Sequence, residues 1–127
     1  MTLEAFHGRA TGNVTLNGVT ITDKLIRRHC FAIGKEDAHW PSLTCRETLI
    51  YASLFFDVRC GSEGLDAYID QLLSRLGLTE CGEMRCCHLS LVQRRLLLLA
   101  MAVAKGPTVL FMDEPTTGKL RSSVLSI

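Results

Sequence analysis

Residues 108–118 read Thr-Val-Leu-Phe-Met-Asp-Glu-Pro-Thr-Thr-Gly, and this stretch is the strongest indicator of the fold that we expect for the chain. Its four apolar residues at 109–112 predict a strand buried on both faces, as in the middle of a parallel sheet. Asp113 and Glu114 follow where this strand leaves the core. Because ligands of open α/β sheets bind beyond the carboxyl ends of the strands, we expect ligand chemistry at this acidic pair.

The two adjacent carboxylates suggest a division of roles. One carboxylate can hold a hydrated Mg²⁺ while the other orients or deprotonates a water molecule, as phosphoryl transfer to water requires. The alternative is that Asp113 and Glu114 only cap the turn that follows the strand. The longer run through Pro-Thr-Thr-Gly is a more specific pattern than the acidic pair alone.

Composition and charge exclude some classes of function for the chain. Its 127 residues are 47% hydrophobic and 21% charged, an ordinary globular mixture that fits one small domain or a piece of a larger one. The net charge of +1 gives no electrostatic reason to expect nucleic acid as a partner. The longest apolar stretch, residues 96–104, is shorter than half of the ~20 residues that a membrane-spanning helix needs. The amino terminus also lacks the apolar core of a secretory signal, so we expect no segment here to cross a membrane by itself.

The cysteines raise the question of metal binding. Most of them are scattered among residues of expected helices and strands, which suits reduced thiols in a cytosolic protein. Cys81, Cys86, Cys87 and His88 invite a zinc interpretation. Their spacing lacks a Cys-x-x-Cys pair, however, and adjacent cysteines rarely bind one ion, so zinc is disfavoured. The six cysteines are Cys30, Cys45, Cys60, Cys81, Cys86 and Cys87.

Two capping boxes mark the starts of helices. Thr44 is followed three residues later by Glu47, and Ser90 is followed at the same spacing by Gln93. In each pair the hydroxyl accepts a hydrogen bond from the third amide, and the longer side chain reaches back to the amide of the cap. The helix expected at 91–105 is apolar on most faces, so we expect it to be buried.

Hydrophobic periodicity predicts two further helices before that one. The first starts after Thr44, and the second is capped by Ser62 and ended by Gly77. The core stripe of the first helix consists of Leu49, Ala52, Phe55 and Phe56. The core stripe of the second helix consists of Leu65, Ile69, Leu72, Leu73 and Leu76.

The amino-terminal part of the chain predicts mainly strands. Residues 3–7 read as the end of a helix, and residues 13–17 alternate in polarity like a half-exposed strand with a turn at Asn17-Gly18. Residues 30–33 form another short apolar run. The order of elements fits a mixed α/β domain with a helical insertion.

Several stretches resemble the nucleotide-binding domain of ABC transporters, in the order expected for that family. Residues 108–118 resemble its Walker B segment, and residues 89–95, Leu-Ser-Leu-Val-Gln-Arg-Arg, resemble its signature motif, Leu-Ser-Gly-Gly-Gln-Arg-Arg. Residues 43–49, Leu-Thr-Cys-Arg-Glu-Thr-Leu, are similar to a run of the G subfamily, the half-size transporters of pigment precursors, sterols and xenobiotics. Residues 2–9 resemble the helix after the phosphate loop, and residues 14–19 resemble the strand that follows it.

The resemblance implies a fold and a division of the chain. The fold is an α/β partial P-loop NTPase (ABC ATPase) domain with a helical subdomain. All of residues 1–127 belong to a partial nucleotide-binding domain. Residues 1–40 and 105–120 then form the region of the core sheet, and residues 41–104 form the helical subdomain and the signature helix.

The resemblance also implies the site and its partners. Asp113 would hold Mg²⁺ through water and Glu114 would polarise the attacking water. Ser90 and Gln93 would face a nucleotide bound by a partner domain, and Lys35 stands where the family has the glutamine of the Q-loop. The cofactors implied are ATP and Mg²⁺. The partners implied are a second nucleotide-binding domain and a transmembrane domain, without nucleic acid, which places the chain at the cytoplasmic face of a membrane.

Some departures from the family pattern bear on activity. The phosphate loop, Gly-x-x-x-x-Gly-Lys-Ser/Thr, is absent from the sequence, and its amides and lysine normally cradle the β- and γ-phosphates. Leu91 and Val92 replace two signature glycines, which lack side chains and so let the helix start approach a phosphate. Residues 119–122 read Lys-Leu-Arg-Ser where the family has Leu-Asp-Ser, and the strand of the switch histidine is missing.

Two classes of function therefore stand beside each other. In the first, the chain is a piece of a G-type transporter whose parent couples ATP hydrolysis to the movement of lipids or xenobiotics. In the second, it is a truncated, non-catalytic relic or interaction module that keeps the core of the family without its chemistry. Ser90 and Gln93 contact nucleotide under the first and serve only as a helix cap under the second. A small zinc or redox protein is a distant third interpretation.

Overall fold

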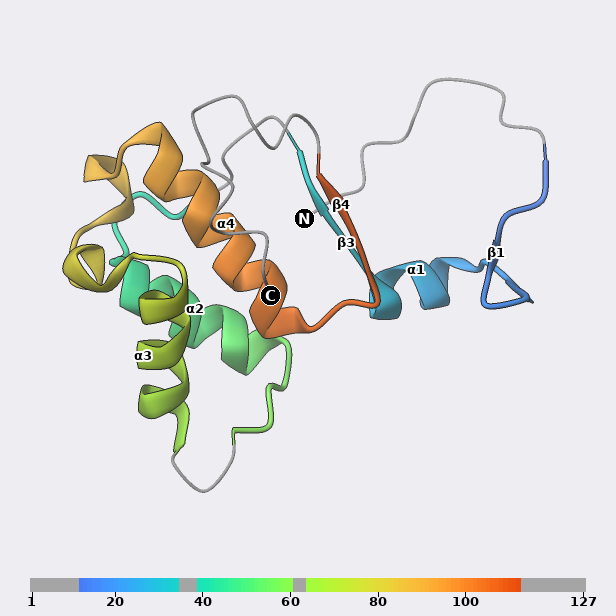
Figure 1. The fold of residues 1–127 in the computed structure, drawn as a ribbon, viewed down its shortest axis with the longest axis horizontal. Coiled ribbons are helices and arrows are strands. Elements are labelled where there is room, and N and C mark those ends of the chain that lie inside the picture. Colours follow the sequence, from blue (N-terminus) through green and yellow to red (C-terminus); the bar gives the residue numbers. More distant parts are fainter. Residues whose placement is uncertain (1–11, 35–38, 61–63, 113–127) are drawn as a thin grey trace.

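The computed structural model describes residues 12–34, 39–60 and 64–112 (Figure 1). Within these residues α4 lies in the middle, with α2 and α3 on one side and the β3–β4 pair on the other. The elements in chain order are β1 Thr15–Leu16, β2 Val19–Thr20, α1 Asp23–His29, β3 Cys30–Ile33, α2 Cys45–Phe55, α3 Gly64–Arg75, the 3-10 helices η1 Thr79–Cys81 and η2 Cys86–His88, α4 Leu91–Lys105 and β4 Val109–Met112.

The β3–β4 pair confirms the mixed α/β prediction. The two strands are parallel, with Cys30 opposite Val109 and Ile33 opposite Met112. A parallel pair needs a long crossover connection, and here the helices α2, α3 and α4 lie between the two strands in the sequence. The register places the carboxyl ends of both strands at one edge of the pair, which is where ligands of such sheets bind.

The prediction that the strand at 109–112 is buried on both faces is wrong. Phe111 is 57% exposed and Met112 is 40% exposed, although Leu110 packs against Phe31 and α4. In the described part of the chain β4 is paired with β3 alone, and α4 covers one face of the pair. An apolar run of this length therefore predicts the strand correctly, but it does not indicate how many other elements cover that strand.

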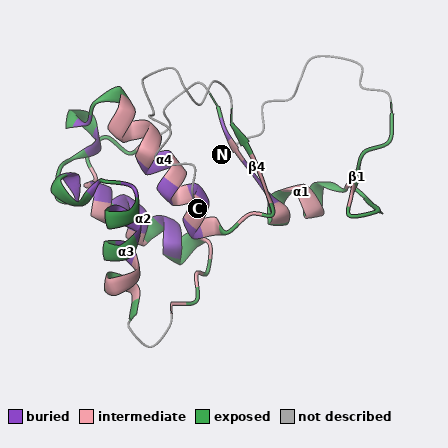
Figure 2. Cartoon of the chain, viewed as in Figure 1, coloured by how far each residue is buried: buried purple, intermediate pink, exposed green. Residues whose placement is uncertain are grey.

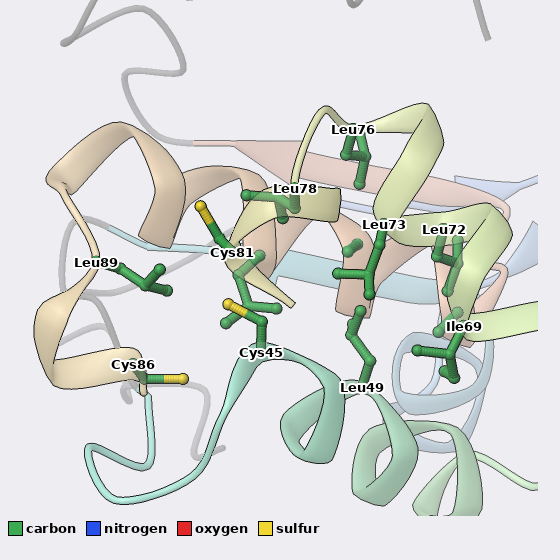
Figure 3. Close-up of a cluster of buried hydrophobic side chains, with 13 residues drawn as sticks. Cys45, Leu49, Ile69, Leu72, Leu73, Leu76, Leu78, Cys81, Cys86 and Leu89 are labelled. Carbon is green, nitrogen blue, oxygen red and sulfur yellow. The ribbon is translucent and has the colours of Figure 1, made fainter. Parts of the chain in front are cut away.

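The largest core lies among the three long helices. It is built from the inward faces of α2, α3 and α4 and from the segment that joins α3 to α4 (Figures 2 and 3). The stripe predicted for α3 is confirmed: Ile69, Leu72, Leu73 and, just after the helix, Leu76 are buried, and Leu65 is partly buried against the same core. Gly77 ends the helical path at a φ of +66°, a conformation that costs glycine little.

The stripe predicted for α2 is confirmed in its first half and wrong at Phe55. Leu49 and Ala52 are buried, whereas Phe55 is 84% exposed. Phe56 is the residue that turns inward, and its ring meets Phe31 edge to face at 6.2 Å. At 100° per residue, Phe56 lies roughly 20° from the direction of Leu49, but Phe55 lies roughly 120° away. Helical geometry therefore places Phe56, and not Phe55, on the buried face of α2.

The prediction of a buried helix at 91–105 is confirmed, because α4 packs on two sides. Leu97 and Ala100 belong to the helical core, whereas Leu98 and Ala102 pack against Phe31 of β3. A helix with cores on both sides has little room for polar residues, which explains its apolar sequence. The helix ends at a glycine in the left-handed conformation, as its carboxyl-terminal cap.

The amino-terminal elements are small and mostly exposed. β1 and β2 form a hairpin around the predicted turn, with Asn17 at φ +50° and Gly18 at φ +80°, as a two-residue primed turn requires. The helix α1 has no counterpart among the sequence predictions, although Thr22 caps it by accepting from the amide of Leu25 at 3.4 Å. The helix end expected at 3–7 and the cap expected at Ser62 lie outside the described residues.

The helices are short relative to the thickness of a membrane. Across residues 12–34, 39–60 and 64–112, each helix falls short of the length and apolarity that spanning a bilayer would require.

Candidate functional site

The structure describes two of the five predicted site residues. Ser90 and Gln93 lie at the start of α4, whereas Lys35, Asp113 and Glu114 lie outside the described residues. The two strands from which these three residues continue are described, and their carboxyl ends lie side by side. The described part of the expected site therefore consists of the first turn of α4 and the edge of the β3–β4 pair.

The first turn of α4 forms the predicted capping box. The hydroxyl of Ser90 accepts a hydrogen bond from the amide of Gln93 at 3.3 Å. The amide of Ser90 donates in return to Oε1 of Gln93 at 2.9 Å. Ser90 itself has extended backbone angles, as a residue before a helix should. The predicted capping box is thus confirmed, and both interpretations of these two residues, as nucleotide contacts or as a cap only, remain compatible with it.

Gln93 makes a further contact that the sequence did not suggest. Its amide Nε2 donates to Sγ of Cys81 at 2.9 Å, across the short segment that joins α3 to α4. Cys81 closes η1 and is buried in the helical core. Gln93 therefore connects the start of α4 to a turn that belongs to the core.

The two residues that replace the signature glycines occupy the first two positions of α4. Leu91 is 70% exposed and Val92 is half-buried. The first amides of a helix have no acceptor within the helix and attract anions, so this is where a phosphate would approach. The exposed Leu91 side chain places apolar surface at that point.

Two arginines hold the start of α4 against neighbouring backbone. Arg94 donates to the carbonyls of Leu89 at 3.1 Å and Cys87 at 3.3 Å. Arg95 donates to the carbonyl of Gly34, immediately after β3. Positive side chains near the amino terminus of a helix oppose its dipole, so carbonyl partners offset that cost. This unfavourable placement marks both arginines in the sequence as side chains that need an acceptor, but it does not name the carbonyls that they contact.

The start of α2 is attached to the same joining segment. Backbone hydrogen bonds run from the amide of Cys45 to Met84 and from the amide of Arg46 to Gly82. A third runs from the amide of Cys86 back to Leu43. The predicted capping box of Thr44 and Glu47 is present as well. The starts of α2 and α4 therefore share one support, the segment 79–89.

Arg46 reinforces this support from outside the core. Its guanidinium donates to Asp70 of α3 at 2.5 Å and to Glu83 at 2.9 Å. Hydrogen bonds to the two carboxylates raise the pKa of Arg46 above its ordinary value. One side chain thus links α2, α3 and the joining segment, although its exposed partners limit the stability it contributes.

The cysteines of the joining segment and of the start of α2 lie mainly in the core. Cys45, Cys81 and Cys86 are buried together, while Cys87 is exposed. Burial raises the pKa of the Cys45 thiol to about 12, with the nearby Cys86 and Cys81 adding to the effect. In the part of the chain that the structure describes, no three His, Cys, Asp or Glu side chains are arranged to hold a metal ion.

An exposed aromatic surface lies beside the start of α2. Trp40 and Tyr51, with Ser42 and Leu43, line a shallow open depression of about 230 Å³. Phe55 adds exposed apolar surface farther along the same helix. Contiguous apolar surface of this kind is typical of contacts between proteins.

Comparison with known sequences identifies the class of the protein. The sequence model of the family described as ABC transporter matches residues 1–117. ABC transporter G family member STR2 of Medicago truncatula is 32% identical over 94% of this chain and 17% of its own length. ABC transporter G family member 6 of Arabidopsis thaliana is 33% identical, also over 94% of this chain and 17% of its own length. The ABC-type transporter claG of Penicillium crustosum is 33% identical over the same shares.

The chain therefore belongs to the ABC transporter family. Its relatives place it in the G subfamily, and the matched segment is part of the nucleotide-binding domain, which has the P-loop NTPase fold. The chain spans less than a fifth of the length of these curated relatives.

Proposed function

We propose that this chain contributes one nucleotide-binding face to a transporter that couples ATP hydrolysis to the movement of lipids or xenobiotics. The observation that carries the proposal is the arrangement around α4. Its start carries the signature stretch at Ser90, and Arg95 near this start donates to the carbonyl of Gly34, immediately after β3. β4 is parallel to β3, so the acidic pair continues the chain from the same edge of the pair. The start of α4 therefore lies at the edge of the β3–β4 pair from which the chain continues to the other residues of the expected site.

We further propose a division of the chain between those parts. Residues 1–40 and 105–120 form the region of the core sheet, and residues 41–104 form the helical subdomain with the signature helix. The helical core supports this division, because all of its residues fall within 41–104, and α4 joins it to the second cluster at β3.

The proposed roles of the site residues follow from their chemistry. Asp113 and Glu114 supply the carboxylate oxygens that a hydrated Mg²⁺ and an attacking water require. Ser90 supplies a hydroxyl beside the free amides of the α4 start, where a phosphate of ATP is stabilised. Lys35 follows the carboxyl end of β3 in the sequence, and its ammonium group cannot hold Mg²⁺ as the amide oxygen of the family's glutamine does. Its side chain would either contact phosphate or stay in solvent. Bound Mg·ATP would supply the phosphoryl group whose transfer to water drives transport.

The proposed partners are a second nucleotide-binding domain and a transmembrane domain at the cytoplasmic face of a membrane. The exposed surface of Trp40, Tyr51 and Phe55 supports a contact with another protein, because isolated domains rarely expose neighbouring aromatic residues. The first turn of α4 supports a contact with a nucleotide held by the second domain.

A non-catalytic interaction module is the alternative, and one observation favours it. The exposed Leu91 puts a branched apolar side chain where the family keeps a glycine, at the point of phosphate approach. Under this alternative the chain keeps its helical core and its docking surface but contributes little to nucleotide affinity.

The two proposed functions can be distinguished by measuring how the complete protein that contains this chain binds and hydrolyses Mg·ATP. If the proposal holds, Asp113→Asn weakens binding of Mg·ATP, and Glu114→Gln leaves binding intact while turnover falls by at least ~10²-fold. Ser74→Ala, at an exposed position of α3, serves as a control outside both the site and the proposed contact surface. Turnover and binding that are equal in all of these proteins would favour the interaction module.

A further inference from the structure

The backbone amide of Gln93 and both polar atoms of its side chain are engaged inside its own chain. The backbone amide donates to the hydroxyl of Ser90, and Oε1 accepts from the amide of Ser90. The side-chain Nε2 donates to Sγ of Cys81. The side chain is half-buried between the first turn of α4 and η1, so it points toward the core.

The acceptor of that last hydrogen bond is rigidly held. Cys81 is 6% exposed, and its amide donates to the carbonyl of Leu78 at 3.0 Å while its carbonyl accepts from the amide of Met84 at 2.9 Å. Figure 3 shows Cys81 beside Leu78 in the helical core, with Cys45 nearby. Gln93 is therefore tied to a part of the molecule that opens only when the core opens.

The first turn of a helix is otherwise its least restrained part. Its amides lack helical acceptors, and a capping box secures the turn to its own cap but not to the rest of the protein. A hydrogen bond to the core adds that second attachment. In this chain Gln93 supplies both, since its oxygen completes the box and its nitrogen reaches the core.

We propose that Gln93 is a positioning residue: through its hydrogen bond to Cys81 it fixes the first turn of α4 against η1 and so orients Ser90, instead of contacting nucleotide itself. The proposal rests on the proposed function only in the statement that Ser90 faces a nucleotide. The attachment itself is a property of the chain without any ligand.

Hydrogen exchange of the complete protein without nucleotide tests the attachment. Cys81→Ala removes the acceptor, and Cys81→Ser keeps one. We expect exchange in a peptide covering residues 90–96 to be about fivefold faster in Cys81→Ala than in wild type, and to be restored in Cys81→Ser.

The matched control is Cys86→Ala, which removes an equally buried thiol from the same core but leaves Gln93 untouched. It should leave exchange of residues 90–96 at the wild-type rate. If Cys81→Ala and Cys86→Ala change that peptide equally, Cys81 only fills the core and the proposal is overturned.

Gln93→Glu is the second variant, for the case in which Cys81→Ala does not fold. It keeps the acceptor of the capping box and removes the amide donor. A carboxylate at the start of a helix stabilises that turn by itself. Faster exchange in residues 90–96 of this variant therefore reports the lost contact with Cys81, and unchanged or slower exchange counts against the proposal.

Titration of the same proteins with Mg·ATP separates positioning from direct contact. If Gln93 positions Ser90, Cys81→Ala weakens binding and Cys81→Ser restores it. If Gln93 contacts the nucleotide itself, Gln93→Glu abolishes binding while Cys81→Ala leaves it unchanged, which overturns the proposal. A wild-type protein that binds no Mg·ATP would contradict the proposed function instead, and the exchange experiment would still decide whether the attachment exists.

Discussion

The helical part of this molecule buries more side chains completely than its β3–β4 part does. The core of α2, α3 and α4 encloses many fully buried side chains, among them Leu49, Ile69 and Leu97. The cluster at β3 is smaller, and its outer strand β4 leaves Phe111 exposed. The helical part completes its core with its own residues, whereas the described part of the sheet leaves apolar surface for other elements to cover.

The same contrast separates the two parts of the proposed site. The signature turn is attached to the deep core through the segment 79–89, so its geometry is set by the better packed part of the molecule. The acidic pair follows the more exposed part, at the end of β4. Four predictions, in order of decreasing magnitude, test whether the two parts differ as described.

Removing a buried leucine should cost the most stability. We expect Leu49→Ala to lower the free energy of unfolding by about 2 to 5 kcal/mol, because it leaves a cavity in the helical core. Leu110→Ala in the half-buried β4 should cost roughly 1 to 2 kcal/mol. Chemical denaturation of the purified protein measures both. Equal losses of stability at the two positions would show that Leu49 and Leu110 are equally well packed, which would contradict the contrast between the two parts.

The buried thiol of Cys45 should make stability depend on alkaline pH. Its pKa is raised to about 12 in the folded protein from 9.0, so between these values the unfolded chain releases a proton that the folded chain retains. Stability should therefore be fully present below pH 9 and fall as the pH rises toward 12. The measurement is the free energy of unfolding across that range, compared between wild type and Cys45→Ala, in which the fall should be shallower. Cys87→Ala, at an exposed thiol, is the control and should keep the wild-type slope.

The two capping boxes should contribute similar amounts to stability. We expect Thr44→Ala and Ser90→Ala each to lower the free energy of unfolding by about 1 kcal/mol, as the loss of a helix cap typically does. Thermal or chemical unfolding measures the change. A much larger loss of stability for Ser90→Ala would mean that the α4 cap also supports the packing of β3. The helical part and the β3–β4 part would then not be stabilised independently.

Phe55 should contribute the least. We expect Phe55→Ser to change stability by less than about 0.5 kcal/mol, because the side chain is largely exposed. The neighbouring Phe56→Ser should cost clearly more, since that ring packs against Phe31 of β3. Unfolding of the two variants side by side provides the measurement. A reversed order would contradict the assignment of Phe56 as the aromatic contact between α2 and the sheet.

Much of the local structure follows from short patterns in the sequence. The capping boxes at Thr44 and Ser90, the primed turn at Asn17-Gly18 and the stripe of α3 all form as predicted. Each depends on residues within a few helical turns of one another, so the chain carries the information locally. The signature and Walker B patterns likewise point to the family without reference to the fold, because those motifs are runs of adjacent residues.

Contacts between distant segments could not be inferred in this way. The exposure of Phe55 and Phe111, the contact of Gln93 with Cys81, and the contact of Arg95 with Gly34 depend on which segments meet in space. Local spacing and adjacent residues were enough to specify most of the elements, their caps and the family. Which apolar residues are covered, and what supports the signature turn, was set at the tertiary level, because burial and hydrogen bonding between segments far apart in the chain arise only when those segments pack together.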